Sequence, residues 1–194
     1  VRLAAIDIGS NAARLLITDV ISGPQGTKEF IKVVLVRVPL RLGFDVFDKG
    51  EIPPAKVEKI IKTIKSYQLL LEVYDVKHWK ACATSAMRDA VNSPEIIKKV
   101  KAETGIEIQI ISGKEEASFI YENHIAENLT DEESYLYVDV GGGSTELTFF
   151  SDNKLIFKES FNIGTIRLLK NQVTEATWDE MKECITKKTK GYHH

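Results

Sequence analysis

The stretch YVDVGGGSTELTFF, residues 137–150, decides the fold of this chain. One acid, Asp139, stands between two valines, and Gly141, Gly142 and Gly143 follow shortly after it. The apolar residues on both sides predict two buried strands, and the three glycines predict a tight turn between them. A carboxylate is costly to bury without a partner, so its place beside such a turn points to a binding site.

The same pattern occurs near the start of the chain, in AAIDIGSNAARLLI, residues 4–17. A constant offset of 132 residues aligns Asp7 with Asp139, Gly9 with Gly141, Ser10 and Asn11 with Gly142 and Gly143, and Leu15 with Leu147. Each copy reads as strand, acid, turn and strand, and a polar linker precedes the second copy. The repeat therefore predicts two related domains.

The rest of the chain alternates between strand-like and helix-like segments. Strands are expected at residues 3–9, 13–22, 29–40, 78–86, 106–111, 135–150 (with the turn inside it) and 154–162, and helices at 55–74, 93–104, 112–128, 164–172 and 177–190. Ser93 is the expected N-cap of the second helix, with Pro94 at its first position, and residues 43–54 are expected to form a loop. This alternation is typical of α/β proteins, in which helices cover a mainly central sheet.

Composition excludes several classes of protein. The chain has 194 residues, 43% of them hydrophobic and 28% charged, which is typical of a soluble globular protein. Its net charge of −2 gives no basic surface for nucleic acid. Cys82 and Cys184 lack metal-ligand spacing and are expected to be reduced thiols in a cytoplasmic protein. No apolar run reaches the roughly 20 residues that span a bilayer, and no signal peptide is expected.

The two turns have the composition of anion sites. A turn without side chains lets backbone N–H groups converge on one point, where they bind phosphate oxygens. Short donors add to each turn, namely Ser10 and Asn11 in the first copy and Ser144 and Thr145 in the second. A carboxylate next to the turn would hold Mg²⁺, which bridges to the phosphate. The alternative is that the glycines only permit a sharp hairpin.

Four motifs carry a resemblance to a known family. AIDIGSNAARLLI, ATSAMRDA, ISGKEEASFIY and VDVGGGSTEL, in this order and spacing, resemble the exopolyphosphatase and guanosine pentaphosphate phosphatase family. That family belongs to the actin, Hsp70 and sugar-kinase superfamily, whose two ribonuclease-H-like domains face each other across a cleft. The resemblance implies an α/β fold with a duplicated ribonuclease-H-like (actin-like ATPase) domain. We expect the first domain at residues 1–126 and an incomplete second domain at residues 127–194.

The motif SGKEEA contains two adjacent acids with different expected roles. Ser112 and Glu115 have the spacing of a capping box, so Glu115 is expected to bond a free backbone N–H at the start of a helix. Glu116 has no such role, and the resemblance implies that it is the catalytic glutamate that deprotonates the attacking water. The alternative is an exposed acid favoured by the helix dipole.

The resemblance also implies roles for other residues. Glu146 and Asp139 would share the region of the metal and the water, and Asp7 would be a further ligand of Mg²⁺. Arg88, in ATSAMRDA, would contact the phosphoryl chain, since a guanidinium binds phosphate through two hydrogen bonds. An ion pair of Arg88 with Asp89, or a salt bridge between domains at Glu146, stays open. Arg41 is a weaker candidate for phosphate contact.

The expected activity is that of an exopolyphosphatase that releases terminal orthophosphate from inorganic polyphosphate with Mg²⁺. Guanosine pentaphosphate (pppGpp) as the substrate, or a phosphate or nucleotide sensor without catalysis, stays open, and a related kinase is least favoured. No nucleic-acid or membrane partner is expected. An incomplete second domain would expose one face of its sheet, so we expect a marginal or swapped second half unless a partner covers it, and a homodimer stays open.

Overall fold

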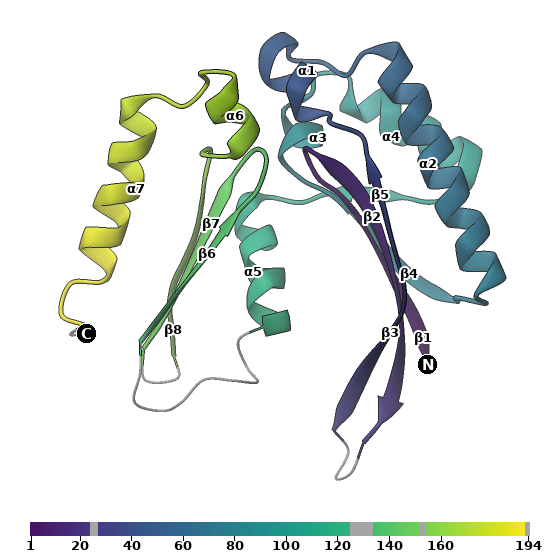
Figure 1. Cartoon of the computed structure of the whole chain (residues 1–194), viewed down its shortest axis with the longest axis horizontal. Helices are drawn as coiled ribbons and strands as arrows, with labels where there is room; N and C mark the ends of the chain where they lie inside the picture. The colour runs from purple at the N-terminus through teal and green to yellow at the C-terminus, as the bar shows by residue number, and fades with distance from the viewer. Residues whose placement is uncertain (24–26, 125–133, 152–153, 193–194) are drawn as a thin grey trace. The chain divides into compact units, whose positions relative to one another are not determined.

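The structure is a computed structural model that describes residues 1–23, 27–124, 134–151 and 154–192. The chain divides into two compact units, Val1–Ile110 and Ile111–His194. Each unit contains its own sheet, as the ribbon drawing shows (Figure 1). The domain boundary expected at residues 126 and 127 lies outside the described residues.

The first unit is built on a five-stranded mixed sheet with the order β3-β2-β1-β4-β5. The strands are β1 (Arg2–Ile8), β2 (Ala12–Ser22), β3 (Lys28–Pro39), β4 (His78–Ala83) and β5 (Ile108–Ile110). The first three strands pair antiparallel, whereas β4 pairs parallel with β1, and β5 pairs parallel with β4. This is the mixed sheet expected from the alternation of elements. Its central strand is β1, which lies between β2 and β4.

Helices α2 (Pro54–Val73) and α4 (Ser93–Thr104) pack against each other, α2 on β2 and α4 on β5. Their apolar faces and the facing side of the sheet form the core, which includes Ile6, Ile8, Leu15, Ile17, Ile60, Ile64, Tyr67 and Val100. Pro54 begins α2, where its missing N–H has no cost, and left-handed Gly105 ends α4. The helix predicted at residues 55–74 is therefore confirmed.

Three local predictions were wrong. The segment expected to be a loop contains helix α1 (Gly43–Lys49), which is too short to show apolar periodicity in the sequence. The strand expected at 78–86 ends at Ala83, and α3 (Ser85–Asp89) follows it. Ser93 is the first residue of α4, and Asn92 is the N-cap. The Asn92 side chain instead bonds both backbone polar groups of Ile52, at 3.1 and 2.9 Å.

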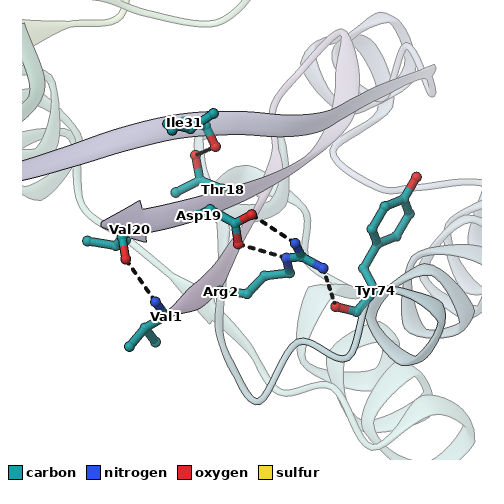
Figure 2. A network of polar contacts seen from close by, with 7 residues as sticks. All are labelled: Val1, Arg2, Thr18, Asp19, Val20, Ile31 and Tyr74. Carbon is teal, nitrogen blue, oxygen red and sulfur yellow. Dashed lines mark hydrogen bonds and ion pairs between the residues drawn. The ribbon is translucent and has the colours of Figure 1, made fainter. Parts of the chain in front are cut away.

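Arg2 joins three segments of the first unit (Figure 2). Its guanidinium donates two hydrogen bonds of 2.8 Å to the carboxylate of Asp19 on β2 and one of 3.0 Å to the carbonyl of Tyr74, at the end of α2. This hydrogen bonding lowers the pKa of Asp19. The network fixes the end of α2 against the ends of β1 and β2 that lie away from the Gly9 turn.

The second unit contains a three-stranded antiparallel sheet, with β7 (Thr145–Ser151) between β6 (Tyr135–Val140) and β8 (Lys154–Phe161). Helix α5 (Gly113–His124) packs on β7 and β8, and α7 (Glu175–Lys188) packs on the other face of the sheet, with the short α6 (Thr165–Leu169) before it (Figure 1). The core under α7 consists of Leu147, Phe149, Phe157, Phe161 and Ile163. Within the described residues, the second copy of the fold thus has three strands where the first has five, as expected.

The strand that carries Asp139 is not buried, contrary to the prediction. Leu136, Val138 and Val140 are 44%, 53% and 54% exposed, whereas every residue of β7 is buried. Edge position alone does not explain this exposure, because Phe157 and Phe161 of β8, the other edge strand, are buried in the core under α7. The difference lies in which elements cover each strand, which the apolar sequence of β6 does not reveal. Among the helices of the described residues, none is long and apolar enough to span a membrane.

Candidate functional site

The two turns that the sequence repeat predicts have the same closing hydrogen bond. The N–H of Gly9 donates to the carbonyl of Ala12 at 3.0 Å, and the N–H of Gly141 donates to the carbonyl of Ser144 at 2.8 Å. These two bonds join corresponding residues of the two copies. The repeat therefore extends from the sequence to the backbone geometry of each turn.

In the second unit, the start of α6 binds the carbonyl groups of the turn. The N–H of Thr165 donates to Gly141 at 3.0 Å, and the N–H of Ile166 donates to Gly142 at 2.9 Å. The Nε of Arg167 donates to the carbonyl of Gly143 at 2.7 Å. All three glycine carbonyls of the turn are thus engaged on the side of α6.

This arrangement directs the N–H groups of the turn away from α6. The C=O and N–H of a trans peptide point in opposite directions, and the described residues contain no cis peptide. The N–H groups of Gly142, Gly143 and Ser144 belong to the same three peptides whose carbonyls α6 binds. They therefore lie on the opposite side of the turn, where converging N–H groups bind oxyanions.

The segment after β3 holds the turn of the first unit in a similar way. The N–H of Gly43 donates to the carbonyl of Ser10 at 2.8 Å, and the N–H of Arg41 donates to that of Asn11 at 2.7 Å. Arg41 has φ 56°, in the left-handed region that residues other than glycine seldom adopt. Its backbone conformation therefore serves to place the N–H on the turn, and its side chain is exposed.

The hydroxyl of Ser10 is buried and shares a hydrogen bond of 2.8 Å with the buried hydroxyl of Ser85, at the start of α3. Sequence reasoning did not single out Ser85, although it lies in the same motif as Arg88. Arg88 is half-buried on α3. Thr84, just before α3, donates its N–H to the carbonyl of Ile8 at the end of β1, at 3.2 Å, and this bond holds the start of α3 next to β1. The structure thus joins two motifs that are 75 residues apart.

Asp139 and Glu146 are directly opposite each other on β6 and β7. Opposite residues of an antiparallel pair project on the same face of the sheet. Asp139 is exposed, whereas Glu146 is only 4% exposed and accepts a hydrogen bond of 2.8 Å from the hydroxyl of Ser160 on β8. Two carboxylates therefore lie side by side next to the glycine turn.

Asp7 and Arg14 occupy the corresponding positions of the first unit, on β1 and β2. Their side chains form an ion pair of 2.8 Å, with Arg14 as the donor. The first unit thus pairs an acid with a base where the second unit pairs two acids. The Arg14 guanidinium already offsets the charge of Asp7, and the metal role of Asp7 stays a prediction.

Helix α5 brings the predicted catalytic glutamate to the same sheet. The capping box is confirmed, since the N–H of Ser112 donates to Glu115 at 2.8 Å and the N–H of Glu115 donates to Ser112 Oγ at 3.2 Å. A Cβ at Gly113 would lie 2.6 Å from the side chain of Ser160, so the first turn of α5 lies directly on β8. Glu116 is one turn further along the same face of α5 as Gly113, and its Oε2 is buried.

The second unit by itself therefore contains two groups of predicted site residues on neighbouring elements. Ser160 contacts both, because it bonds Glu146 and lies against the first turn of α5. Thr145 is buried, and its hydroxyl donates to the carbonyl of Ile163. Ser144 is buried as well. The hydroxyls of Ser10 and Thr145 thus bond to partners inside the fold, which leaves the backbone N–H groups of each turn as the better candidates for phosphate contact.

The residues of this site suit Mg²⁺. Within the described residues, no group of three or more His, Cys, Asp or Glu side chains could form a metal cage. Mg²⁺ seldom uses such a cage, because it keeps several waters and binds through one or two carboxylates together with substrate phosphates. Asp139 and Glu146, next to a turn that is predicted to bind phosphate, provide that combination.

Comparisons with known proteins agree with this geometry. A sequence profile described as the Ppx/GppA phosphatase family matches residues 21–189. The chain is 36% identical over 171 residues to a bifunctional 3-dehydroquinate synthase/phosphatase of Fusobacterium nucleatum, covering 85% of this chain and 25% of that protein. It is 30% identical over 167 residues to exopolyphosphatase 1 of Mycobacterium tuberculosis, covering 86% of this chain and 47% of that protein.

Solved structures agree as well. A Ppx/GppA family member of Aquifex aeolicus is similar with a TM-score of 0.72 at 30% identity, covering 96% of this chain and 60% of that one. An exopolyphosphatase of Cytophaga hutchinsonii is similar with a TM-score of 0.76 at 27% identity, covering 98% of this chain and 61% of that one. The chain thus spans about half the length of the exopolyphosphatase that it matches in sequence.

Proposed function

The chain belongs to the Ppx/GppA phosphatase family, and from this premise we propose that it serves as an exopolyphosphatase-type phosphoric anhydride hydrolase. The substrate is inorganic polyphosphate, and the product is orthophosphate released from the end of the chain. One observation supports this proposal above the others. The carbonyls of the Gly141–Gly143 turn are engaged by α6, which directs the turn's N–H groups outward beside the two carboxylates of Asp139 and Glu146.

The N–H groups of Gly142, Gly143 and Ser144 bind the oxygens of the terminal phosphoryl group. The turn of the first unit, Gly9–Asn11, and the guanidinium of Arg88 bind phosphate by the same chemistry. Phosphoryl transfer of this kind depends mainly on positioning and charge neutralisation, with little covalent chemistry for the protein to perform. The fixed backbone of each turn provides the positioning.

Glu116 orients the attacking water and accepts its proton. The water oxygen forms a bond to the terminal phosphorus, the bridging P–O bond breaks, and the shortened polyphosphate leaves with the bridging oxygen. Capping by Glu115 fixes the first turn of α5 and therefore the carboxylate of Glu116. The buried Oε2 of Glu116 supports this role, because water exclusion strengthens the carboxylate as a general base.

Asp139 and Glu146 would hold Mg²⁺ in the second unit, and Asp7 is a proposed Mg²⁺ ligand of the first unit. The ion, when bound, neutralises charge on the phosphate oxygens. Ser160 keeps one oxygen of Glu146 in place through its hydrogen bond of 2.8 Å. The proposed enzyme works in the cytoplasm, where its two cysteines, neither of which is in a disulfide, stay reduced.

The proposal is tested with the purified chain, Mg²⁺ and polyphosphate by measuring the release of orthophosphate. We expect Glu116→Gln to lower the rate at least ~100-fold, as loss of a general base does. Glu115→Gln is the matched control, because glutamine preserves a capping box. Equal release by the wild type and Glu116→Gln would contradict the role of Glu116.

The same assay decides between the alternatives within this fold. Faster release of orthophosphate from pppGpp than from polyphosphate would identify the nucleotide as the substrate. Membership of the family does not decide between these two substrates. Tight binding of polyphosphate without turnover would identify a sensor. Formation of ADP from added ATP, without release of orthophosphate, would identify a kinase and contradict the hydrolase.

A further inference from the structure

Gly113 and Ser160 lie closer together than any side chain at position 113 would allow. A Cβ added to Gly113 would be 2.6 Å from both Cβ and Oγ of Ser160, a separation that real Cβ atoms essentially never show. Gly113 does not have a positive φ, so glycine is required here for space rather than for its backbone conformation. The backbone of α5 therefore lies directly against the side chain of Ser160.

Ser160 also belongs to the row of residues that contains the two proposed Mg²⁺ ligands. It is directly opposite Glu146 on β7, which is directly opposite Asp139 on β6. Opposite residues project on the same face of a sheet, so the three side chains form one row across the three strands. The hydroxyl of Ser160 donates a hydrogen bond of 2.8 Å to Oε1 of Glu146, which is only 4% exposed. Ser160 thus connects this row to the first turn of α5.

A second contact holds α5 on β8. Lys158, two residues before Ser160 on the same face of β8, donates a hydrogen bond to Oγ of Ser118. Glu116 lies between Gly113 and Ser118 along α5, so the helix is attached to β8 on both sides of this residue. The distance from Glu116 to the row of carboxylates is therefore set by how closely α5 sits on β8. At the first turn of α5, the size of the residue at position 160 determines that distance.

We propose that Ser160 is a positioning residue that holds Glu116 at its working distance from the two proposed Mg²⁺ ligands. This inference rests on the proposed function, because it concerns the spacing between the proposed general base and the ligands Asp139 and Glu146. Ser160 acts in two separable ways. Its hydroxyl fixes the carboxylate of Glu146, and its small volume admits the first turn of α5.

The proposed chemistry is sensitive to both actions. A group that takes a proton from the attacking water has to stand at a defined place, and a misplacement of about 1 Å can cost ~100-fold in rate. A residue that orients a metal ligand typically contributes about 10–100-fold to the affinity for the metal. The hydroxyl of Ser160 should therefore affect Mg²⁺ binding, and its small size should affect turnover.

The first test removes the hydroxyl. Ser160→Ala keeps Cβ and deletes the hydrogen bond to Glu146. We expect Mg²⁺, titrated into the purified chain by isothermal calorimetry, to bind roughly tenfold more weakly to this variant. Ser151→Ala is the matched control, because Ser151 is also a buried serine of this sheet, and its hydroxyl accepts a hydrogen bond of 2.9 Å from Ser134. Ser151 is at the far end of β7 from Glu146, so this variant should bind Mg²⁺ as the wild type does.

The second test exchanges the two small side chains. Gly113→Ala should lift α5 from β8 and lower kcat for orthophosphate release at least ~10-fold at saturating Mg²⁺. Its affinity for tripolyphosphate, measured by calorimetry, should stay close to that of the wild type, because α6 and not α5 holds the glycine turn. In the double variant Gly113→Ala/Ser160→Gly, the strand gives up the volume that the helix gains, so α5 can return. We expect a higher kcat and a higher melting temperature than for Gly113→Ala alone, with kcat measured where circular dichroism shows both variants folded.

Either of two results would overturn this inference. They are a Mg²⁺ affinity of Ser160→Ala equal to that of the wild type, and a double variant no more active than Gly113→Ala. If Gly113→Ala does not fold, the Mg²⁺ affinity of Ser160→Ala decides alone.

Failure of the proposed function would give a different pattern. A wild type that binds Mg²⁺ and releases no orthophosphate would contradict the proposed function. The Mg²⁺ affinity of Ser160→Ala and the melting temperatures of the two Gly113 variants would then still decide the role of Ser160. A wild type that does not bind Mg²⁺ would contradict both.

Discussion

The backbone of Gly164 lies so close to Gly142 that a Cβ on Gly164 would be 2.5 Å from both the carbonyl carbon and the carbonyl oxygen of Gly142. A real Cβ atom essentially never lies this close to a non-bonded atom, so a side chain at Gly164 would force the backbone to shift. The segment between β8 and α6 therefore supports the glycine turn directly, in addition to the hydrogen bonds from Thr165, Ile166 and Arg167.

We expect Gly164→Ala to destabilise the second unit by about 1–3 kcal/mol, the usual cost of overpacking. The cause is contact rather than backbone strain, because Gly164 has φ −138° and ψ 158°, which alanine adopts freely. Chemical denaturation measures the change. The control is Gly9→Ala, whose Cβ would meet only the carbonyl of Ala12, at 3.5 Å, and which should retain wild-type stability. Equal stability of Gly164→Ala and Gly9→Ala would contradict the close packing.

Replacing Arg167 with glutamine should weaken anion binding by roughly tenfold, consistent with the 1.5–3 kcal/mol of a charge-assisted hydrogen bond. The substitution removes the bond of 2.7 Å from Nε to the carbonyl of Gly143, so this peptide is free to rotate its N–H away from the phosphate. Titration calorimetry with tripolyphosphate measures the affinity. Arg37→Gln, on an exposed part of β3, removes the same charge and should leave affinity nearly unchanged. An equal loss of affinity for tripolyphosphate in the two variants would indicate a general effect of charge and contradict the role of the Arg167 hydrogen bond.

Tyr67 should make the first unit sensitive to alkali. Burial raises the pKa of Tyr67 to about 12, and its hydroxyl donates to the carbonyl of Ala13 at 3.0 Å. Since the folded pKa lies above that of the unfolded chain, the stabilisation is complete below about pH 10 and is lost as the pH rises to about 12. The loss is of the order of 2 kcal/mol. Tyr67→Phe should be less stable than the wild type at pH 8. Its free energy of unfolding, measured by urea denaturation, should also change less between pH 10 and pH 12.

Asp19 should contribute to acid sensitivity. Hydrogen bonding from Arg2 lowers the pKa of Asp19 below its usual range (Figure 2). A lowered folded pKa gives stabilisation that is present above the unfolded value of about 3.9 and is lost as the pH falls through the folded value. The melting temperature of Asp19→Asn should therefore fall less than that of the wild type between pH 5 and pH 2.5. If the melting temperatures of the two proteins fall equally with pH, the Arg2–Asp19 pair does not contribute to acid sensitivity.

Removal of divalent metal should stop phosphate release without unfolding the chain. Asp139 and Glu146 are held by strand pairing and, for Glu146, by Ser160, so the fold does not depend on an ion between them. We expect EDTA to abolish release and Mg²⁺ to restore it, with an unchanged circular dichroism spectrum. Unfolding by EDTA would instead identify a structural metal.

Sequence reasoning succeeded where a feature depends on neighbouring residues or on the repeat. The paired turns follow from Asp7 and Asp139 with their glycines, and the capping box follows from the spacing of Ser112 and Glu115. Local patterns of this kind specify backbone geometry with little help from the rest of the fold. The α/β class and most of the strands and helices were predicted for the same reason.

The features that were missed depend on tertiary contacts. The hydrogen bond between Ser10 and Ser85 joins two serines that have no local signal. The exposure of Val138 depends on which elements cover β6, whereas its sequence resembles that of the buried Ile6. Helix α1 is stabilised by contacts of Val46 and Phe47 with the core, and its seven residues are too few for a periodic pattern.

The Gly141–Gly143 turn offers hydrogen-bond donors alone, since α6 occupies its carbonyl oxygens. Hydrogen-bond donors alone bind a tetrahedral anion by its shape and negative charge, whichever element is its central atom. Sulfate, vanadate and arsenate should therefore compete with the substrate at this turn. Discrimination among these ions has to come from groups beside the turn, such as the carboxylates of Asp139 and Glu146, and sulfate-rich buffers would mask weak inhibitors.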